Sequence, residues 1–351
     1  MVKALFILKR RGDYKPSEQA VLSMSTGLFN SASFMSAMLN GMNIASDMVV
    51  VNDNNDIDRE VTRSKPTHVF IEALWVTPTK FHVLQQLHPT VTWVIRLHSD
   101  TPFIANEGMA MDWICDYSGY DNVIIAANAP RIQRELQMIL KLRNGYTKQQ
   151  AQRKVIYLPN YYPQSYHTKP FDHRKPTLDI CCFGAVRPMK NHLLQAMAAL
   201  EFADHHRKQL RFHINVGRVE GKGEPVMRNI ENLFAQVYHT GHRLVAHEWT
   251  PREQFLQLCS TMDMGMQVSL TETFNIVGAD LISQGVPLIS SHEIPWAAGL
   301  FTAEPTSSQS MLHKLHMTWE LPGLNVWWQQ RNLRAYTNQT KAVWRRYLRG
   351  K

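Results

Sequence analysis

The sequence predicts an α/β protein of two domains, each built on a parallel β-sheet with helices on both faces. Apolar runs of strand length alternate with helical patterns, which is typical of βαβ units and therefore of parallel sheets. The alternation stops at residues 161–176, a stretch rich in Pro, Tyr and His without periodicity, and then begins again. A length of 351 residues also exceeds that of a typical single-core domain.

The first half opens with an apolar run at residues 2–8, which predicts a buried strand. The basic sequence Lys9-Arg10-Arg11 follows this strand, and Gly27 begins a helical pattern. Further strands are predicted at residues 47–51, 67–74, 90–97, 122–127 and 154–159. Because open α/β sheets bind ligands at the carboxyl ends of their strands, we expect the basic sequence to bind a phosphate group of a substrate; a solvated charged turn explains it equally well.

The second half repeats the alternation. An apolar run at residues 178–183 predicts a strand, which leads into a loop at residues 184–191 and then a helix. Strands are also predicted at residues 210–216, 262–268 and 288–289. Residues 331–351 are helical in pattern, with basic residues interleaved with Trp and Tyr. This tail is either a helix anchored by its aromatic side chains or a contact with nucleic acid or a membrane surface.

The most informative stretch is SLTETFNIVGADLISQGVPLISS, at residues 269–291. It predicts a loop that carries Glu272, a short helix that contains Asp280, and a turn into a buried strand. Backbone N–H groups at the start of the helix lack helical partners, which suits a phosphate. These groups belong to Asn275, Ile276 and Val277. The two carboxylates could hold two hydroxyl-bearing ends of one ligand; the alternative is an ordinary βαβ segment with two surface carboxylates.

This stretch resembles the E-x7-E motif of GT-B glycosyltransferases, in particular retaining family 4, which is written S-x-x-E-x-F-G-x-x-x-x-E…G-x-P. The residues in register are Ser269, Glu272, Phe274, Gly285 and Pro287. Asp280 replaces the second Glu of the motif, and Asn275 replaces its Gly. The resemblance implies that Glu272 contacts the donor sugar as a catalytic residue and that Asp280 holds the ribose of the nucleotide.

A second element, Gly-x-x-Arg-x-x-Lys-Asn, consists of Gly184, Arg187, Lys190 and Asn191. It resembles the loop with which the same enzymes bind the donor diphosphate. A leaving nucleoside diphosphate gains negative charge, and a fixed guanidinium and ammonium stabilise that charge without a metal ion. The resemblance implies a metal-independent enzyme without a cofactor, whose donor substrate is a nucleotide-sugar of the UDP-sugar type. It also implies that the helix led by Gly27 brings backbone close to the donor.

The resemblance covers most of the chain and implies a GT-B fold, in which two Rossmann-like domains face a central cleft. Residues 1–163 are then expected to form the acceptor-side domain and residues 164–330 the nucleotide-sugar domain. Residues 331–351 are expected to form a basic helix that packs back on the N-terminal domain.

The first domain offers three candidates for the residue that faces the reacting sugar. His98 and Asp100 follow one predicted strand, and Glu72 lies at the end of another. In a retaining enzyme such a residue orients the sugar or the acceptor, whereas in an inverting enzyme Asp100 takes the proton of the acceptor.

Composition bears on partners and location. The formal net charge of +9 and a pI near 9.4 favour a polyanionic partner, either nucleic acid or an anionic membrane surface. The longest apolar runs have strand length, so no membrane insertion is expected. The four cysteines show no metal-ligand spacing, which indicates reduced thiols and a cytoplasmic location.

The sequence therefore predicts a glycosyltransferase whose acceptor is a 5-hydroxymethylated base in DNA, as in a phage system. The acceptor prediction depends on the basic charge and on a short likeness to phage DNA glucosyltransferases, which is carried by Thr177-Leu178-Asp179, Gly184, Arg187 and by Asp100 with Pro102-Phe103. One alternative is a transferase for a cell-surface glycan or glycolipid. Another is a binding module for nucleotide-sugar or nucleic acid without turnover. The oligomeric state is left open.

Overall fold

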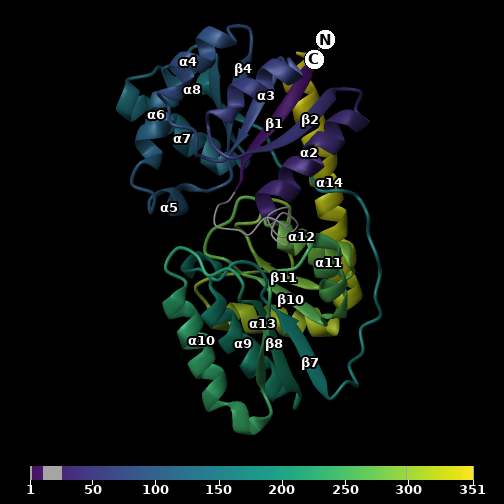
Figure 1. The fold of residues 1–351 in the computed structure, drawn as a ribbon. Helices are drawn as coiled ribbons and strands as arrows, with labels where there is room; N and C mark the ends of the chain where they lie inside the picture. Colours follow the sequence, from purple (N-terminus) through teal and green to yellow (C-terminus); the bar gives the residue numbers. More distant parts are fainter. Residues whose placement is uncertain (1, 11–25, 298, 351) are drawn as a thin grey trace. The chain divides into compact units, whose positions relative to one another are not determined.

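The computed structural model describes residues 2–10, 26–297 and 299–350. The chain forms two compact units: unit 1 comprises Met1–Pro163 and Thr337–Lys351, and unit 2 comprises Gln164–Tyr336. Each unit contains a six-stranded sheet (Figure 1). All strand pairs within the two sheets are parallel. The predicted fold class, an α/β protein with two Rossmann-like parallel sheets, is confirmed.

The sheet of unit 1 has the strand order β2-β1-β3-β4-β5-β6. Its strands are β1 (Lys3–Lys9), β2 (Ala45–Val51), β3 (His68–Glu72), β4 (Thr92–Leu97), β5 (Val123–Ala127) and β6 (Val155–Tyr157). Its helices are α2 (Gly27–Gly41), α3 (Asp56–Ser64), α4 (Lys80–Leu87), α5 (Thr101–Ile104), α6 (Ala110–Ser118), α7 (Pro130–Asn144) and α8 (Lys148–Lys154). The central strands are apolar runs because parallel sheets are buried on both faces.

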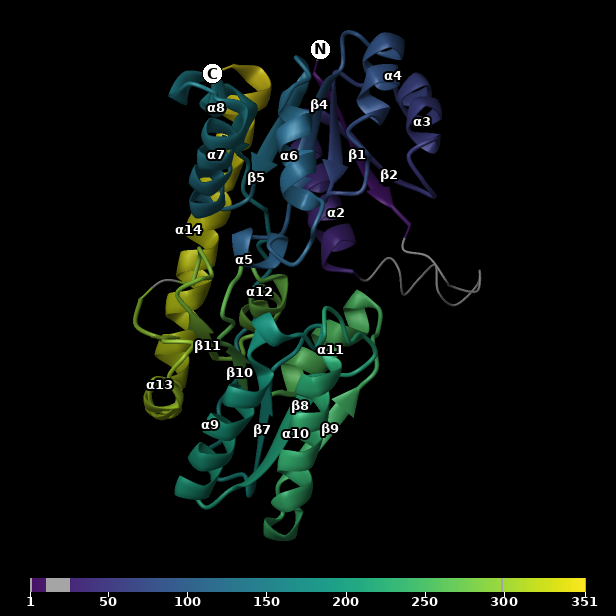
Figure 2. The same ribbon diagram turned by 90° about the vertical axis from the view of Figure 1, so that its left-hand side faces the viewer.

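Two hydrophobic cores lie on the two faces of this sheet, since successive strand residues point to opposite sides. Leu5 and Ile7 of β1 pack in the core that α3, α4, α6 and α7 cover. Phe6, between them, packs in the second core with Met35 of α2 and Trp344 near the end of the chain. Figure 2 shows helices on both sides of the sheet.

The sheet of unit 2 has the strand order β12-β11-β10-β7-β8-β9. Its strands are β7 (Thr177–Cys181), β8 (Gln209–Asn215), β9 (Arg243–His247), β10 (Met264–Gln267), β11 (Leu288–Ser291) and β12 (Thr302–Ala303). Its helical segments are η1 (Pro188–Lys190), α9 (His192–His205), α10 (Glu224–Gln236), η2 (Tyr238–Thr240), α11 (Arg252–Thr261), α12 (Ile276–Ser283) and α13 (Ser308–Glu320).

The main core of unit 2 lies under α9, α10 and α13 and includes Met264 and Met266 of β10. Gly265, between these two residues, faces α12 on the opposite side of the sheet. A Cβ at Gly265 would lie 2.6 Å from Leu281 Cδ1, so a side chain here would force Leu281 to shift. The lack of a side chain at Gly265 therefore allows Leu281 of α12 to pack directly against β10.

The last helix, α14 (Pro322–Arg349), begins before residue 331, where the sequence analysis placed its start. Its C-terminal part belongs to unit 1. There the buried Trp344 donates from Nε1 to the carbonyl of Pro159 at 2.8 Å, and Arg349 donates to the carbonyl of Met42 at 2.8 Å. The Trp344 ring also packs 5.1 Å from the Phe70 ring, centroid to centroid. Among the described residues, no helix is both long and apolar enough to cross a membrane.

We predict that Trp344→Ala destabilises unit 1 by about 3–5 kcal/mol, because it leaves a large cavity in the core and removes a hydrogen bond. Urea unfolding followed by circular dichroism measures the change. Trp327→Ala is the matched control on the same helix, because Trp327 is 55% exposed. Equal losses of stability in the two variants would contradict the packing described here.

Candidate functional site

The loop after β7 begins at Gly184, which has a φ of +116° and so favours glycine. Its N–H donates to Asn215 Oδ1 at 2.9 Å, which holds the loop against β8. A Cβ at Gly184 would lie 3.9 Å from both Lys190 Cε and Val277 Cγ2. The loop therefore lies next to Lys190 and the first turn of α12, and the positive φ, not a lack of space, is what favours glycine at this position. Arg187, in the same loop, is half-buried and precedes η1.

Glu272 is the centre of polar contacts in this region and is buried, with 9% exposure. Its Oε1 accepts from the Lys190 ammonium, with which it forms a salt bridge. The same oxygen accepts from Ser269 Oγ and from Asn275 Nδ2, each at 3.1 Å. A buried carboxylate is stable only when it is paired and hydrogen-bonded, and Glu272 has both kinds of partner.

Asn275 links this carboxylate to the start of α12. It has left-handed backbone angles, φ 60° and ψ 82°, which glycine and asparagine adopt most readily. The Asn that replaces the Gly of the motif therefore suits the backbone. Its Oδ1 caps the helix by accepting from the Gly278 N–H at 2.8 Å, and its Nδ2 also reaches Gln267 Oε1 at 2.8 Å. The N–H groups of Ile276 and Val277 lie in the first turn of α12, where helical acceptors are lacking.

Gln195, on α9, joins the loop that ends at Lys190 to the segment that leads to Glu272. This residue was not recognised in the sequence. It is fully buried; its Oε1 accepts from the Val268 N–H at 2.8 Å, and its Nε2 donates to the Lys190 carbonyl at 2.7 Å. The Leu270 N–H also donates to the Met189 carbonyl at 2.9 Å. A polar residue on the buried face of a helix was the only sequence signal for this role.

Asp280 is buried on α12, and its Oδ1 accepts from Arg252 Nη2 of α11 at 2.7 Å. Arg252 is a second residue that the sequence analysis missed, although its place at the start of a predicted helix was visible. The structure thus gives Asp280 a cationic neighbour. Its contact with a ribose stays a prediction.

His192, the first residue of α9, is fully buried and directly follows the loop that carries Arg187 and Lys190. Burial and the positive charges of Lys190 and Arg187 lower the pKa of His192 to about 3. The imidazole is therefore neutral at physiological pH.

Unit 1 contains a second buried network at the carboxyl ends of β3 and β4. Glu72 accepts from Arg96 Nη1 at 2.6 Å through one oxygen and lies 2.5 Å from His98 Nε2 through the other. Arg96 Nη2 donates to Asn160 Oδ1 at 2.6 Å. Burial disfavours the carboxylate of Glu72, but the charges of Arg96 and His98 outweigh this effect and hold its pKa below the usual range.

The structure places the other first-domain candidates separately. Asp100 precedes α5, and its carboxylate forms a salt bridge with Arg131 Nη2 at 3.1 Å. Gly27 is the first residue of α2, and the preceding Thr26 caps this helix. Lys9 and Arg10 are exposed at the end of β1, whereas Arg11 lies outside the described residues.

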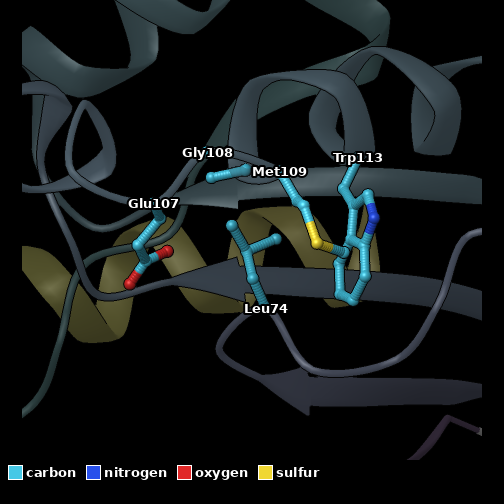
Figure 3. A pocket seen from close by; sticks show the side chains of 6 residues that line it. Leu74, Glu107, Gly108, Met109 and Trp113 are labelled. Carbon is cyan, nitrogen blue, oxygen red and sulfur yellow. The ribbon is translucent and has the colours of Figure 1, made fainter.

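A pocket of about 240 Å³ opens beyond β3 and was not predicted (Figure 3). Its lining consists of Leu74, Glu107, Gly108, Met109, Ala110 and Trp113. In Figure 3 the side chain of Met109 points toward the ring of Trp113, and the carboxylate of Glu107 lies apart from both. Burial raises the pKa of Glu107. The pocket thus combines an apolar wall with one carboxyl group.

Comparison with known proteins establishes the fold. No protein-family model matches the chain, and no curated protein sequence does. A UDP-forming α,α-trehalose-phosphate synthase from Burkholderia xenovorans has a similar structure, with a TM-score of 0.65, 11% identity, and coverage of 98% of this chain and 97% of that chain. A sucrose-phosphate synthase from Thermosynechococcus elongatus is similar with a TM-score of 0.63 and 14% identity, and the similarity covers 99% of this chain and 100% of that chain. The Anabaena protein Alr3699/HepE, solved in complex with UDP, has a TM-score of 0.57 and 13% identity, with coverage of 97% of this chain and 96% of that chain.

These similarities extend over nearly the whole length of each chain, so both units have counterparts in the solved structures. The architecture is that of GT-B glycosyltransferases. At this level of identity the likeness defines the fold, and the chemistry must be argued from the residues of this chain.

We predict that His192 makes the protein sensitive to acid. Its folded-state pKa near 3 lies below the value of 6.5 for an unperturbed histidine. Between these values the unfolded chain binds a proton that the folded chain does not, so stability falls as pH is lowered from about 6.5 toward 3. His192→Leu should flatten this dependence.

Urea unfolding at a series of pH values measures the slope. The control is His239→Leu, which removes an exposed histidine of η2. A slope that is the same in His192→Leu and the unmodified chain would contradict the prediction.

Proposed function

We propose that the protein is a glycosyltransferase that uses a nucleotide-sugar donor, bound by unit 2. One observation carries this proposal: the buried Lys190–Glu272 pair lies beside the capped start of α12. These groups gather where β7 and β10 end, at the edge where parallel α/β sheets bind ligands. The cationic loop and the helix N–H groups suit a diphosphate, and the carboxylate suits a sugar hydroxyl.

A bound donor would replace the contact between Lys190 and Glu272 by separate contacts of each residue with the donor. A diphosphate beside the loop would attract the ammonium of Lys190 and the guanidinium of Arg187. Glu272 would then accept a hydrogen bond from a donor hydroxyl, while Ser269 and Asn275 keep its carboxylate in place. As the glycosidic bond breaks, both cations and the N–H groups of α12 stabilise the growing charge on the leaving group.

The nucleotide is proposed to be uridine-based. HepE was solved in complex with UDP, and the synthase from Burkholderia xenovorans is described as UDP-forming. Asp280 would accept from a ribose hydroxyl, and Arg252 would hold its carboxylate in a fixed direction. No metal ion is needed in this scheme, because side chains and helix N–H groups neutralise the diphosphate.

In unit 1 we assign the role of orienting the sugar or the acceptor to His98. Its side chain is 13% exposed, whereas that of Asp100 is 3% exposed and paired with Arg131. Glu72, held by Arg96, fixes the imidazole of His98. Glu72 and Arg96 are therefore positioning residues in this proposal.

The acceptor is proposed to be a hydroxyl compound that carries phosphate. The net charge of +9 and the exposed Lys9 and Arg10 favour an anionic acceptor. Two of the similar structures are named as synthases of sugar phosphates, which favours a sugar phosphate over a base in DNA. The DNA acceptor stays a prediction from charge and from a short sequence likeness.

We predict that Glu272→Ala lowers the rate of sugar transfer at least about a hundredfold, as expected for loss of a contact made in the transition state. Glu272→Gln keeps the size of the side chain and removes its charge, so it separates electrostatics from packing. Release of UDP and formation of glycoside are measured together. Glu253→Gln, at an exposed position of α11, is the control. Unchanged transfer in both Glu272 variants would refute the site.

A second prediction concerns the acceptor. The purified chain is incubated with a panel of UDP-sugars and either hexose phosphates or duplex DNA that contains 5-hydroxymethylcytosine, and products are read by mass spectrometry. We expect a sugar to be added to a hexose phosphate. Addition to the DNA base would instead support the sequence-based prediction. Donor hydrolysis alone would direct the search to glycans or glycolipids, and binding of UDP-sugar without turnover would support the binding module.

A further inference from the structure

Three histidines gather at the end of α9 that is distant from the proposed donor site. His205 is the last residue of this helix and His206 is its C-cap, and His316 reaches them from α13, which packs alongside α9. The helix has 14 residues, so its two ends are separated by about 20 Å at about 1.5 Å per residue. The cluster is therefore independent of the proposed transfer reaction.

The ring nitrogens of these histidines are spaced as metal ligands. One ligand nitrogen from each residue lies within 4.8 Å of the other two. His206 Nε2 and His316 Nδ1 are 3.1 Å apart. Two nitrogens bound tetrahedrally at about 2.0–2.1 Å from one zinc ion would be about 3.3 Å apart. His205 is exposed, so its side chain can turn to complete the set.

The backbone that carries two of the ligands is held rigidly. Arg207 has a φ of +54°, and its N–H donates to the Asp204 carbonyl at 3.0 Å. The Lys208 N–H donates to the Ala203 carbonyl at 2.9 Å. These two bonds form a Schellman motif, which fixes the last turn of α9 and the positions of His205 and His206.

Aromatic side chains pack against the imidazole rings of His206 and His316. The His206 ring lies 4.5 Å from the ring of the buried Trp319, and the His316 ring lies 5.1 Å from that of Phe202. Among the charged groups nearby, the negative charge of Glu320 favours a positive charge at His206 and His316, whereas Lys208 disfavours one at His206. The histidines thus pack on apolar side chains, and His205 leaves one side of the cluster open to solvent, from which an ion can enter.

We propose that His205, His206 and His316 bind a late first-row divalent cation, of which Zn²⁺ is the best match. Three neutral imidazoles and a water molecule satisfy tetrahedral zinc. The ion would join α9 to α13 across 110 positions of the sequence, and so would stabilise unit 2. In this proposal the ion stabilises unit 2 and takes no part in sugar transfer.

The test is isothermal titration of Zn²⁺ into the full chain after removal of metals with EDTA. We expect one ion per chain and a rise in Tm on saturation. His205→Gln and His316→Gln should each weaken binding at least about tenfold, since loss of a ligand should cost no less than loss of a supporting contact. His239→Gln should bind like the unmodified chain, because this histidine lies elsewhere, on η2.

The exposed position of His205 makes its variant the one least able to disturb folding, and the far-UV circular dichroism spectrum checks this. Co²⁺ gives an independent readout, because imidazole ligation produces visible absorption bands that both variants should lose. The proposal is overturned if the unmodified chain binds no Zn²⁺. It is equally overturned if the His205 and His316 variants bind Zn²⁺ as tightly as His239→Gln does.

Discussion

The buried salt bridge between Lys190 and Glu272 is the interaction on which the arrangement of unit 2 depends. It joins two loops that are 82 positions apart in the sequence. Removing either partner would leave a charge in a nearly water-free setting, at a cost that usually exceeds the net stability of the pair. Gln195 reinforces the same junction through a neutral hydrogen bond from the Val268 N–H, and Asn275 donates a hydrogen bond to the Glu272 carboxylate. The two loops are consequently held together by two charges that are each stable in this buried position only because the other is present.

Unit 1 also contains a buried carboxylate that is paired with a cation. Glu72 sits at the end of β3 with Arg96 on the neighbouring strand, and the guanidinium also lies 5.3 Å from the ring of Trp344. An arginine can satisfy a carboxylate, an amide and an aromatic face at once, because its group is planar and carries several donors. Both units therefore place a neutralised carboxylate where their parallel strands end. Such groups are costly in a core, and their position at the ligand edge is a physical reason to regard them as functional.

The sequence was informative where local rules decide the structure. Alternating apolar runs defined the two parallel sheets, and the Gly184 loop and the segment from Glu272 to Asp280 were located because glycine, capping residues and charges follow each other at short range. Contacts across long sequence separations were not visible. Arg252 beside Asp280, Gln195 between the loops and the pairing of His206 with His316 arise only when distant elements pack together. Asn275 is instructive because a departure from a familiar motif proved compatible with the left-handed backbone at that position.

The division of the chain has a consequence for biosynthesis. Unit 2 is one continuous segment, whereas the core of unit 1 needs Trp344 and Leu348, which are made after all of unit 2. On the ribosome, the second sheet can thus close while the first still exposes the apolar surface around Phe6 and Phe70. Chaperone dependence should therefore concentrate on the early part of the chain, and a fragment spanning 164–336 is the natural choice for expressing half of the protein alone.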